Sequence, residues 1–574
     1  MSRSFGGAFP ARDSNSPSGN PLKASPYHSQ LVNGTRGMVA AENLYCSDIG
    51  ADILRVGGSA VDAAIASTLC IGVVHSFSSG IGGGGFLLVR NGTNQSELID
   101  FREVAPARAT STMYEKNITL AQVGGLAVAV PGEIRGFEAA HRKYGKLSWA
   151  ELFQPSIQLA RDGFVVDKML AKALKFAEDL VLRDPGFRES FTVPLTRTAE
   201  HRSTLPPVRV AQEGDIIRRT RLAATLERIA SEGPDVFYLG DMATHMAETA
   251  QARGGIVTRQ DFADYRAILR PSLHSEYRGY HVHTAPPPTS GSILAMILNT
   301  LEGFPLEEDC ASYRWVNYHR FVESLKFAYA QRTVLADPAF IPLDKHTIKM
   351  LDKGFAAQVR ANISDTRTFP VPYYNPTYDV DDPHGTTHLS VLDHHGQAVA
   401  LTSTVNLVFG AQVMDPETGI ILNCEMDDFS TQNKTNAFGY SPSPNNRIKP
   451  GKRPLSSAVP VILERDGQVR LVAGASGGSR IISSVAQVLM NAMDFRMPLN
   501  EAVDFSRLHE QLMPDEIRIE EGFEEEFQKY LENKGHNLTL VHFYESAVQV
   551  VSRSSDGVYY GAADDRKKGL AAAV

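Results

Sequence analysis

The sequence predicts a layered α/β fold, and three observations lead to it. The 574-residue chain has 43% hydrophobic and 21% charged residues, which is the composition of a soluble globular protein. Apolar residues first recur at helical spacing, then alternate as in strands up to about residue 475, and return to helical spacing at 480–495. Helices, then strands, then helices in this order fit a layered arrangement. The length allows one large domain or two to four ordinary ones.

The first two thirds of the chain are expected to begin with a short strand and to become mainly helical. Residues 37–44 are typical of a strand, and 47–58 and 59–74 of two helices that end at glycine-rich segments. A glycine loop enters a strand at 80–90, and another strand follows at 96–106. Between 130 and 360, four segments carry apolar residues three and four apart and end in glycine, namely 131–145, 148–163, 221–233 and 240–255.

The segment that follows is expected to be a linker and then a hairpin. Residues 363–385 are rich in proline and have no helical period, which predicts an exposed linker. From Thr387 apolar and polar residues alternate on both sides of a turn at 393–396, which predicts two paired strands with one face toward the core. An Asn, Ser and Pro-rich loop is expected at 430–453.

Charge and terminal composition exclude several classes of partner and leave the compartment open. The net charge is −8 and no run of Lys or Arg occurs, so a nucleic-acid partner is not expected. Residues 1–35 are polar and predicted to be disordered, and the longest apolar run, 63–74, is shorter than the roughly 20 residues of a membrane span. A soluble intracellular protein is favoured, although glycosylation sequons at Asn33, Asn91, Asn94, Asn117, Asn362, Asn433 and Asn537 allow a secretory route.

The four cysteines favour buried thiols over a disulfide framework or a structural zinc site. Cys46, Cys70, Cys310 and Cys424 lie far apart in the sequence, and none forms a C-x-x-C pair.

A possible nucleophile stands where the linker meets the hairpin. A threonine hydroxyl needs a neighbouring base, and cleavage before Thr386 would create one, because the new α-amine titrates near pH 7.7–8.0. Gly385 suits that cleavage, since glycine tolerates unusual dihedrals and leaves its carbonyl open to the Thr386 hydroxyl. An ordinary strand start is the alternative for this stretch taken alone.

A serine offers a rival nucleophile. Residues 474–478 match the G-x-S-x-G elbow around Ser476, between a strand and a helix. Its partners would have to be Asp504 or Asp515 together with His509, His536 or His542. The few residues after the elbow leave little room for the usual triad strands. Gly477 and Gly478 are better placed to offer backbone N–H groups to an oxyanion.

Three further groups could bind the two ends of an amino acid. Glu425, Asp427 and Asp428 lie close together and suit a substrate ammonium; a metal is less favoured because no histidine clusters with them. Ser456 and Ser457 are adjacent hydroxyls, and Arg102 offers a planar fork to a carboxylate. Each group alone could be structural, and Arg102 could pair with Asp100 or Glu103.

Taken together, these segments closely resemble the γ-glutamyltransferase (γ-glutamyl transpeptidase) family over residues 36–565. The resemblance rests on TTHLSV and ALTSTVNLVFG within 386–410, on NCEMDDFS, GKRPLSSAVP and GASGGSR after them, and on GIGGGGF, DFREVAPA and APPPTSGS before them, in the family's order. It implies an N-terminal-nucleophile hydrolase with a four-layer αββα sandwich. It also implies a precursor that cuts itself into a large subunit, 36–385, and a small subunit, 386–574.

The resemblance also implies a role for each matched residue. Thr386 would attack the γ-glutamyl amide, Thr404 would orient it, and Gly477 and Gly478 would hold the oxyanion. The donor α-carboxylate would lie at Arg102, Ser456 and Ser457, and its α-amino group at Asn406, Glu425 and Asp428. Glutathione or its conjugates are the expected donors, and water, an amino acid or a dipeptide the expected acceptors. No metal or other cofactor is implied. A serine hydrolase, a β-lactam-type acylase and a non-catalytic relative remain as alternatives.

Overall fold

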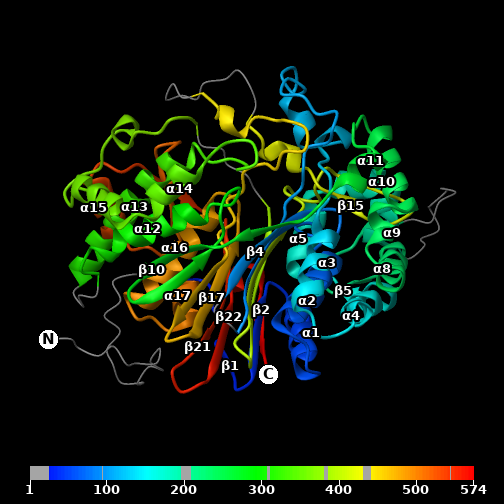
Figure 1. Ribbon diagram of the computed structural model, residues 1–574, viewed down its shortest axis with the longest axis horizontal. Coiled ribbons are helices and arrows are strands. Elements are labelled where there is room, and N and C mark those ends of the chain that lie inside the picture. Colours follow the sequence, from blue (N-terminus) through cyan, green and yellow to red (C-terminus); the bar gives the residue numbers. More distant parts are fainter. Residues whose placement is uncertain are drawn as a thin grey trace.

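Two antiparallel sheets lie face to face between two layers of helices (Figure 1). The computed structural model describes residues 25–92, 95–195, 208–306, 311–379, 385–430, 441–542 and 544–574. The first sheet has the order β23 (Leu570–Ala573), β2 (Gly37–Ala41), β12 (Thr387–Asp393), β13 (Ala398–Thr404), β3 (Gly84–Arg90), β4 (Ser96–Phe101) and β9 (Ile268–Pro271). The second has the order β1 (Val32–Gly34), β22 (Tyr559–Ala563), β21 (Ala547–Arg553), β17 (Gln468–Ser476), β16 (Val461–Arg465), β11 (Tyr280–Thr284) and β10 (Leu273–Tyr277).

The helices divide between the outer faces of the two sheets (Figure 1). The first sheet is covered by α1 (Leu44–Arg55), α2 (Ala60–Val74) and α3 (Glu133–Tyr144), with α4 (Trp149–Asp162), α8 (Thr220–Glu232) and α10 (Asp241–Ala252) outside them. The second is covered by α12 (Gly291–Glu302), α16 (Arg480–Met493) and α17 (Leu499–Asp504), with α13 (Ala311–Arg332) packed on α12. Each layer has its own apolar core, and a third core that includes Leu88 and Val472 fills the space between the sheets. The predicted αββα sandwich is confirmed.

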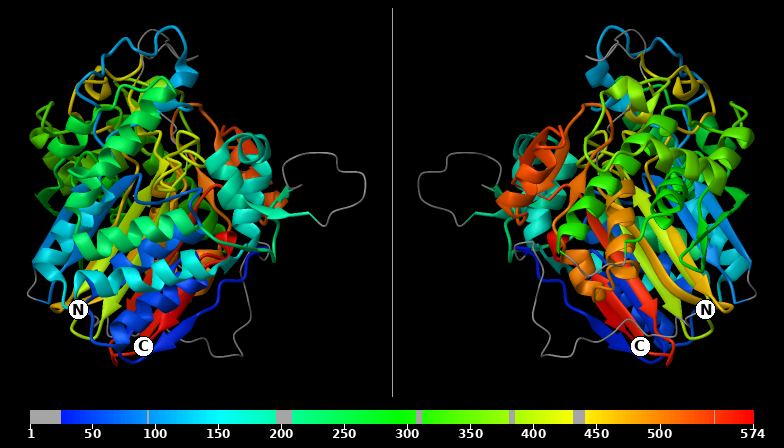
Figure 2. Two further views of the ribbon diagram at one scale, coloured as in Figure 1. Left: turned by 90° about the vertical axis from the view of Figure 1, so that its right-hand side faces the viewer. Right: turned by 90° about the vertical axis from the view of Figure 1, so that its left-hand side faces the viewer.

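Both sheets combine strands from widely separated parts of the sequence. The first sheet places β12, β13 and β23, which all follow Gly385, among β2, β3, β4 and β9, which precede it. The views turned by 90° show the blue segment that contains β1 beside the red C-terminal strands (Figure 2). The C-terminal Val574 carbonyl accepts hydrogen bonds from the backbone of Thr35 and Arg36.

The predicted hairpin is confirmed, but the expectation that one of its faces is exposed to solvent is wrong. β12 pairs with β13 in the register Leu389↔Leu401, and every residue of both strands is buried. The reason is that α2 packs on one face and the second sheet on the other. His388 therefore lies between the sheets, where its ring bonds the Thr402 hydroxyl at 2.9 Å and burial lowers its pKa to about 3.

Three other expectations need correction. Cys46 and Cys70 form a disulfide that joins α1 to α2, whereas Cys424 is a buried thiol; Cys310 lies outside the described residues. The mainly helical region contains the strands β9, β10 and β11, whose polar and apolar residues alternate around the turn at Arg278. The predicted disordered segment, residues 1–35, is too long, because Val32–Gly34 form β1, which pairs with β22.

Some expectations concern residues beyond the described ranges. These are the N-terminal 1–24, part of the linker at 380–384, part of the loop at 431–440, and the sequons at Asn94 and Asn433. The described part of the linker includes a 3-10 turn, Val371–Tyr374, with both end residues buried. No described helix has the length and apolar character that a membrane span needs.

Candidate active site

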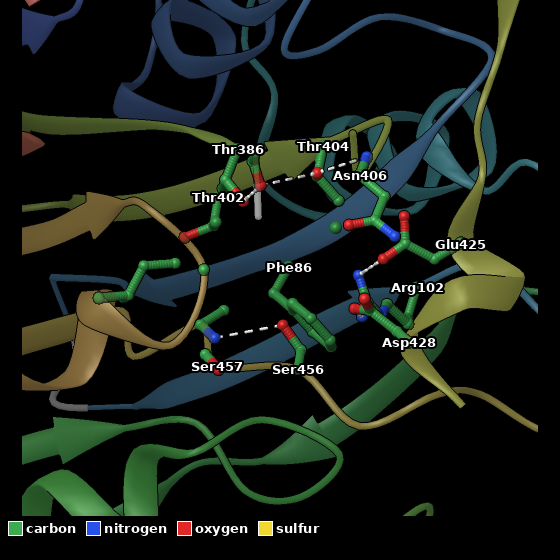
Figure 3. Close-up of a pocket in the computed structure, with 15 residues that line it drawn as sticks. Phe86, Arg102, Thr386, Thr402, Thr404, Asn406, Glu425, Asp428, Ser456 and Ser457 are labelled. Carbon is green, nitrogen blue, oxygen red and sulfur yellow. Dashed lines mark hydrogen bonds and ion pairs between the residues drawn. The ribbon is translucent and has the colours of Figure 1, made fainter. Parts of the chain in front are cut away.

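The candidate site lies where the two sheets end together. Because β12 and β13 are antiparallel, the residue before β12 and the last residue of β13 meet, which brings Thr386 beside Thr404. Arg102 follows β4 at the same end of this sheet, since Gly85 pairs with Phe101. The opposite sheet contributes the segment before β16 and the turn after β17. Figure 3 shows these side chains around one cavity.

The cavity is lined by nearly every predicted site residue. Its lining includes Arg102, Thr386, Thr404, Asn406, Glu425, Asp428, Ser456, Ser457 and Gly478, together with Gly85, Phe86, Gly385, Thr402, Ala458 and Ile481. Asp427 and Gly477 are candidates from the sequence that lie outside the lining, and Gly477 has a packing reason for its place. A Cβ atom there would lie 2.3 Å from the Glu545 carbonyl oxygen, so its place demands glycine for packing.

The Thr386 hydroxyl lies against the carbonyl that precedes it. Its Oγ1 donates to the Gly385 carbonyl oxygen, and the side chain is nearly buried. Gly385 has φ +88°, and a Cβ atom at this position would lie 1.6 Å from the Asn406 carbonyl oxygen. Only glycine satisfies both constraints, because side chains disfavour positive φ and no space exists here for one.

Thr404 and Asn406 support the carbonyl of Gly385 from the other strand. The Thr404 hydroxyl donates to the Gly385 carbonyl oxygen over a long 3.4 Å and accepts the Asn406 backbone N–H at 2.8 Å. The Asn406 side chain donates to the Cys424 carbonyl at 3.1 Å, and its backbone has φ +72°. These residues form a connected row in Figure 3.

Lys567, near the C-terminus, is a site residue that the sequence patterns did not reveal. Its Nζ donates to the Thr386 carbonyl oxygen at 2.8 Å and to the Glu42 carboxylate at 2.7 Å. Burial raises the pKa of Glu42, but Lys567 and His75 outweigh burial and bring it down to about 2. His75 in turn contacts Asp167 at 2.6 Å. Thr386 is therefore anchored to an ionised network through Lys567, which lies 181 residues away in sequence.

Arg102 is surrounded by more acid than one cation can neutralise. Its guanidinium pairs with Glu425 and Asp428 and donates to the Leu455 carbonyl at 3.2 Å, while a Glu103 oxygen lies 3.9 Å away. The Asp100 carboxylate instead accepts the Arg102 backbone N–H and pairs with Arg270 and Arg453. Burial raises the pKa of both Glu103 and Glu425.

Two serines place hydroxyl protons at the same end of the cavity. The Ser457 Oγ accepts from Arg332 at 2.8 Å, and the Ser456 Oγ accepts the Ala458 N–H at 3.2 Å. A hydroxyl that accepts such a bond still has a proton to donate. Together with Arg102, the serines can bind a carboxylate, and the excess acid beside Arg102 can bind an ammonium.

The turn after β17 offers a backbone donor. Gly478 has φ +58° and lines the cavity, and no hydrogen bond to its N–H occurs within the described part of the chain. The turn continues directly into α16, because the Ile481 N–H bonds the Gly478 carbonyl. An N–H in this position can stabilise negative charge on a substrate oxygen.

The geometry does not form the rival serine triad. The buried Ser476 Oγ has no hydrogen-bond partner among the residues the structure describes, and Ser476 is not part of the cavity lining. His509 bonds Ser483 and Gln511, His536 bonds His319, and His542 bonds Glu521. Among the described residues, His319, Glu323 and His536 have ligand atoms close enough together to bind a metal ion. None of the three lines the cavity.

The class of protein follows from fold and site together. A threonine at the head of a central strand, in a sandwich of two antiparallel sheets between helices, is the arrangement of N-terminal-nucleophile hydrolases. A solved structure, cephalosporin acylase from Bacillus halodurans, superimposes with a TM-score of 0.81 and 25% identity, covering 98% of this chain and 99% of that one.

The family follows from comparison with known sequences. The family model described as Gamma-glutamyltranspeptidase matches residues 46–574. Glutathione hydrolase proenzyme 2 of Schizosaccharomyces pombe is 43% identical over 94% of this chain and 87% of its own. Glutathione hydrolase proenzyme of Escherichia coli is 38% identical over 93% of this chain and 91% of its own. The chain belongs to the gamma-glutamyltranspeptidase family.

Proposed function

We propose that this chain is a self-processing γ-glutamyl hydrolase and transferase that cleaves the γ-glutamyl amide of glutathione or of glutathione conjugates. The observation that carries the proposal is one cavity that is lined by a threonine hydroxyl, a glycine with a bare backbone N–H, an arginine, two serines and two carboxylates. The related glutathione hydrolase proenzymes support the same reaction.

The first step is cleavage of the chain between Gly385 and Thr386. The Thr386 Oγ1 attacks the Gly385 carbonyl carbon, and the peptide C–N bond breaks to give an ester and a free α-amine. Water then hydrolyses the ester and leaves a Gly385 carboxylate. The contact of the hydroxyl with this carbonyl, and the Thr404 donor behind it, support this step. The products are a large subunit ending at 385 and a small subunit, 386–574.

The second step is acyl transfer from the donor. The new α-amine takes the Thr386 hydroxyl proton while the oxygen bonds the γ-carbonyl carbon of the donor. The Gly478 N–H, with Gly477 shaping the turn, stabilises the oxyanion. The amide C–N bond breaks, and the leaving amine receives the proton. Water or the amine of an amino acid or dipeptide then attacks the ester and releases glutamate or a new γ-glutamyl amide.

Donor selection follows from the charges in the cavity. The donor α-carboxylate binds Arg102, Ser456 and Ser457, and the α-ammonium binds Asn406, Glu425 and Asp428. The free cavity already contains surplus acid around one guanidinium, so an incoming ammonium supplies the missing positive charge. A β-lactam side-chain donor without an amino acid head would leave that acid unmatched.

The test is an intact-mass measurement of purified protein, together with hydrolysis of γ-glutamyl-p-nitroanilide. We expect a fragment that begins at Thr386, no such fragment in Thr386→Ala, and cleavage and activity in Ser476→Ala. An uncut, active wild type would contradict the threonine mechanism. A cut protein without acyl transfer would indicate a non-catalytic relative, and preference for a cephalosporin side chain would indicate an acylase.

A further inference from the structure

Arg219 is a buried cation that lacks an acidic partner in the described part of the chain. It stands immediately before α8 and is 3% exposed. Its two terminal nitrogens donate to the carbonyls of Gly72 and Gly419 at 3.0 and 2.9 Å, and its Nε has no partner within the described ranges. Burial, with no carboxylate to offset it, lowers the pKa of Arg219 to about 9.

Three other buried arginines of this protein pair with acids. Arg90 pairs with Glu464 at 3.0 Å, Arg507 with Asp564 at 3.0 Å, and Arg566 with both Asp564 and Glu520. A charge transferred from water to a protein interior costs several kcal/mol unless it is paired. Arg219 therefore has a requirement for a counter-charge that the neighbouring described side chains do not meet.

A small pocket adjoins this guanidinium. Its polar lining includes Ser76, Ser79 and the backbone of Gly80 and Gly82, and its apolar lining includes Ile420 and Leu222. The Ser76 Oγ is buried and lacks a partner among the described residues. Leu222 lies in the first turn of α8, whose N-terminus has no side-chain cap. A guanidinium, a hydroxyl and the positive end of a helix dipole thus adjoin the same cavity.

We propose that this cavity binds a small monovalent inorganic anion of the chloride class. The donors are few and the rest of the wall is apolar, which suits a weakly hydrated single charge better than phosphate, whose oxygens need many donors. The anion would neutralise the charge of Arg219 and accept a hydrogen bond from the Ser76 hydroxyl. One ligand would thus satisfy both unpartnered groups.

The position gives the anion a structural role behind the active site. Gly83 follows the cavity-lining glycines and packs so closely on β13 that a Cβ atom there would lie 2.0 Å from the Thr404 carbonyl oxygen. The Gly82 carbonyl accepts the Asn423 side chain at 2.8 Å, and Asn423 in turn accepts the Glu425 N–H at 3.0 Å. Anion binding would therefore stabilise the wall that bears both Thr404 and the ammonium subsite.

The test is thermal unfolding of the purified full-length protein in sodium chloride against sodium gluconate at constant ionic strength. We expect chloride to raise the midpoint saturably by about 2–4 °C in the wild type, since a ligand that binds only the folded state stabilises it. The chloride response should vanish in Arg219→Met and weaken in Ser76→Ala. Arg221→Met is the matched control, because Arg221 lies on the same helix, is half exposed and pairs with Glu189; it should keep the full response.

Diffraction from bromide-soaked crystals gives a second readout that needs no variant. An anomalous peak within hydrogen-bond distance of Arg219 and Ser76 is expected. Equal midpoints in chloride and gluconate at every concentration would overturn the proposal, as would a chloride response that Arg219→Met retains or a cavity that contains no bromide. If Arg219→Met fails to fold, the Ser76→Ala titration and the bromide position decide.

Discussion

Replacing Thr404 with valine should slow cleavage of the precursor far more than it changes the fold. Valine has nearly the same shape as threonine but lacks the hydroxyl. In the uncut chain this hydroxyl is 3.4 Å from the Gly385 carbonyl oxygen, which becomes the oxyanion when Thr386 attacks. The Thr404 Oγ1 also accepts the Asn406 N–H at 2.8 Å. The variant therefore removes one oxyanion donor and leaves one buried N–H without its partner.

These two losses have different magnitudes and different readouts. Removal of one preorganised oxyanion donor typically slows a reaction by about 10²–10³. A buried N–H left unpaired costs about 1–3 kcal/mol of folding stability. We therefore expect the half-time of cleavage to lengthen by about two orders of magnitude, while the thermal midpoint falls by only a few degrees.

The assay is a time course of freshly purified precursor on denaturing gels, with intact mass to identify the new N-terminus. Thr404→Ser is the matched control, because it retains the hydroxyl and should cleave at close to the wild-type rate. If Thr404→Val cleaves within about threefold of the wild type while remaining folded, the hydroxyl does not support the oxyanion and the assignment is refuted.

Four other changes give distinct outcomes. Gly385→Ala should yield only uncut chain on a denaturing gel, because φ is +88° and the added methyl would lie 1.6 Å from a carbonyl oxygen; a cut product at the normal rate would contradict this. Asp428→Asn should raise KM for γ-glutamyl-p-nitroanilide about 10–100-fold with a smaller change in kcat, since a charge-assisted hydrogen bond to the donor ammonium is weakened; an unchanged KM would place the ammonium elsewhere. Burial raises the pKa of Glu133 from 4.5 to about 8, so its contribution to stability is present at pH 4.5 and lost as pH rises through 8. The thermal midpoint of Glu133→Gln minus that of the wild type should therefore increase as pH rises from 5.5 to 8. An unchanged difference would argue against a neutral Glu133. A reducing agent should lower the wild-type midpoint, because the Cys46–Cys70 bond closes 24 residues and such a link contributes about 3 kcal/mol; a Cys46→Ala/Cys70→Ala variant should not respond, and an equal response would exclude the bond.

The sequence was sufficient to predict the layered fold and most of the residues that line the cavity, because those features depend on local patterns. The glycine before Thr386, the hairpin and the acidic and hydroxyl segments each occupy a few consecutive residues. Periodicity locates a strand well but does not tell which layers cover it. For that reason the polar face of β12 was expected in solvent, whereas His388 lies between two sheets.

The features that were missed depend on contacts between distant parts of the chain. Lys567 reaches the Thr386 carbonyl from a charged segment typical of a surface turn. Cys46 and Cys70 belong to two successive helices with no known spacing motif, and only the packing of α1 on α2 brings their sulfurs together. Arg102 lines the same cavity as Thr386, but its simultaneous pairing with Glu425 and Asp428 could not be predicted from two separate sequence segments.

The alternation of early and late strands within each sheet limits what a break at Gly385 can do. Central strands β12 and β13 hydrogen-bond on both sides to strands from the first half of the chain, so neither half possesses a complete sheet. Scission there would alter covalent connectivity and leave almost every hydrogen bond in place. The two products should migrate as one particle under native conditions, melt in one shared transition, and fail to reassemble by simple mixing of separately produced halves, because each half alone would expose unpaired strand edges to aggregation.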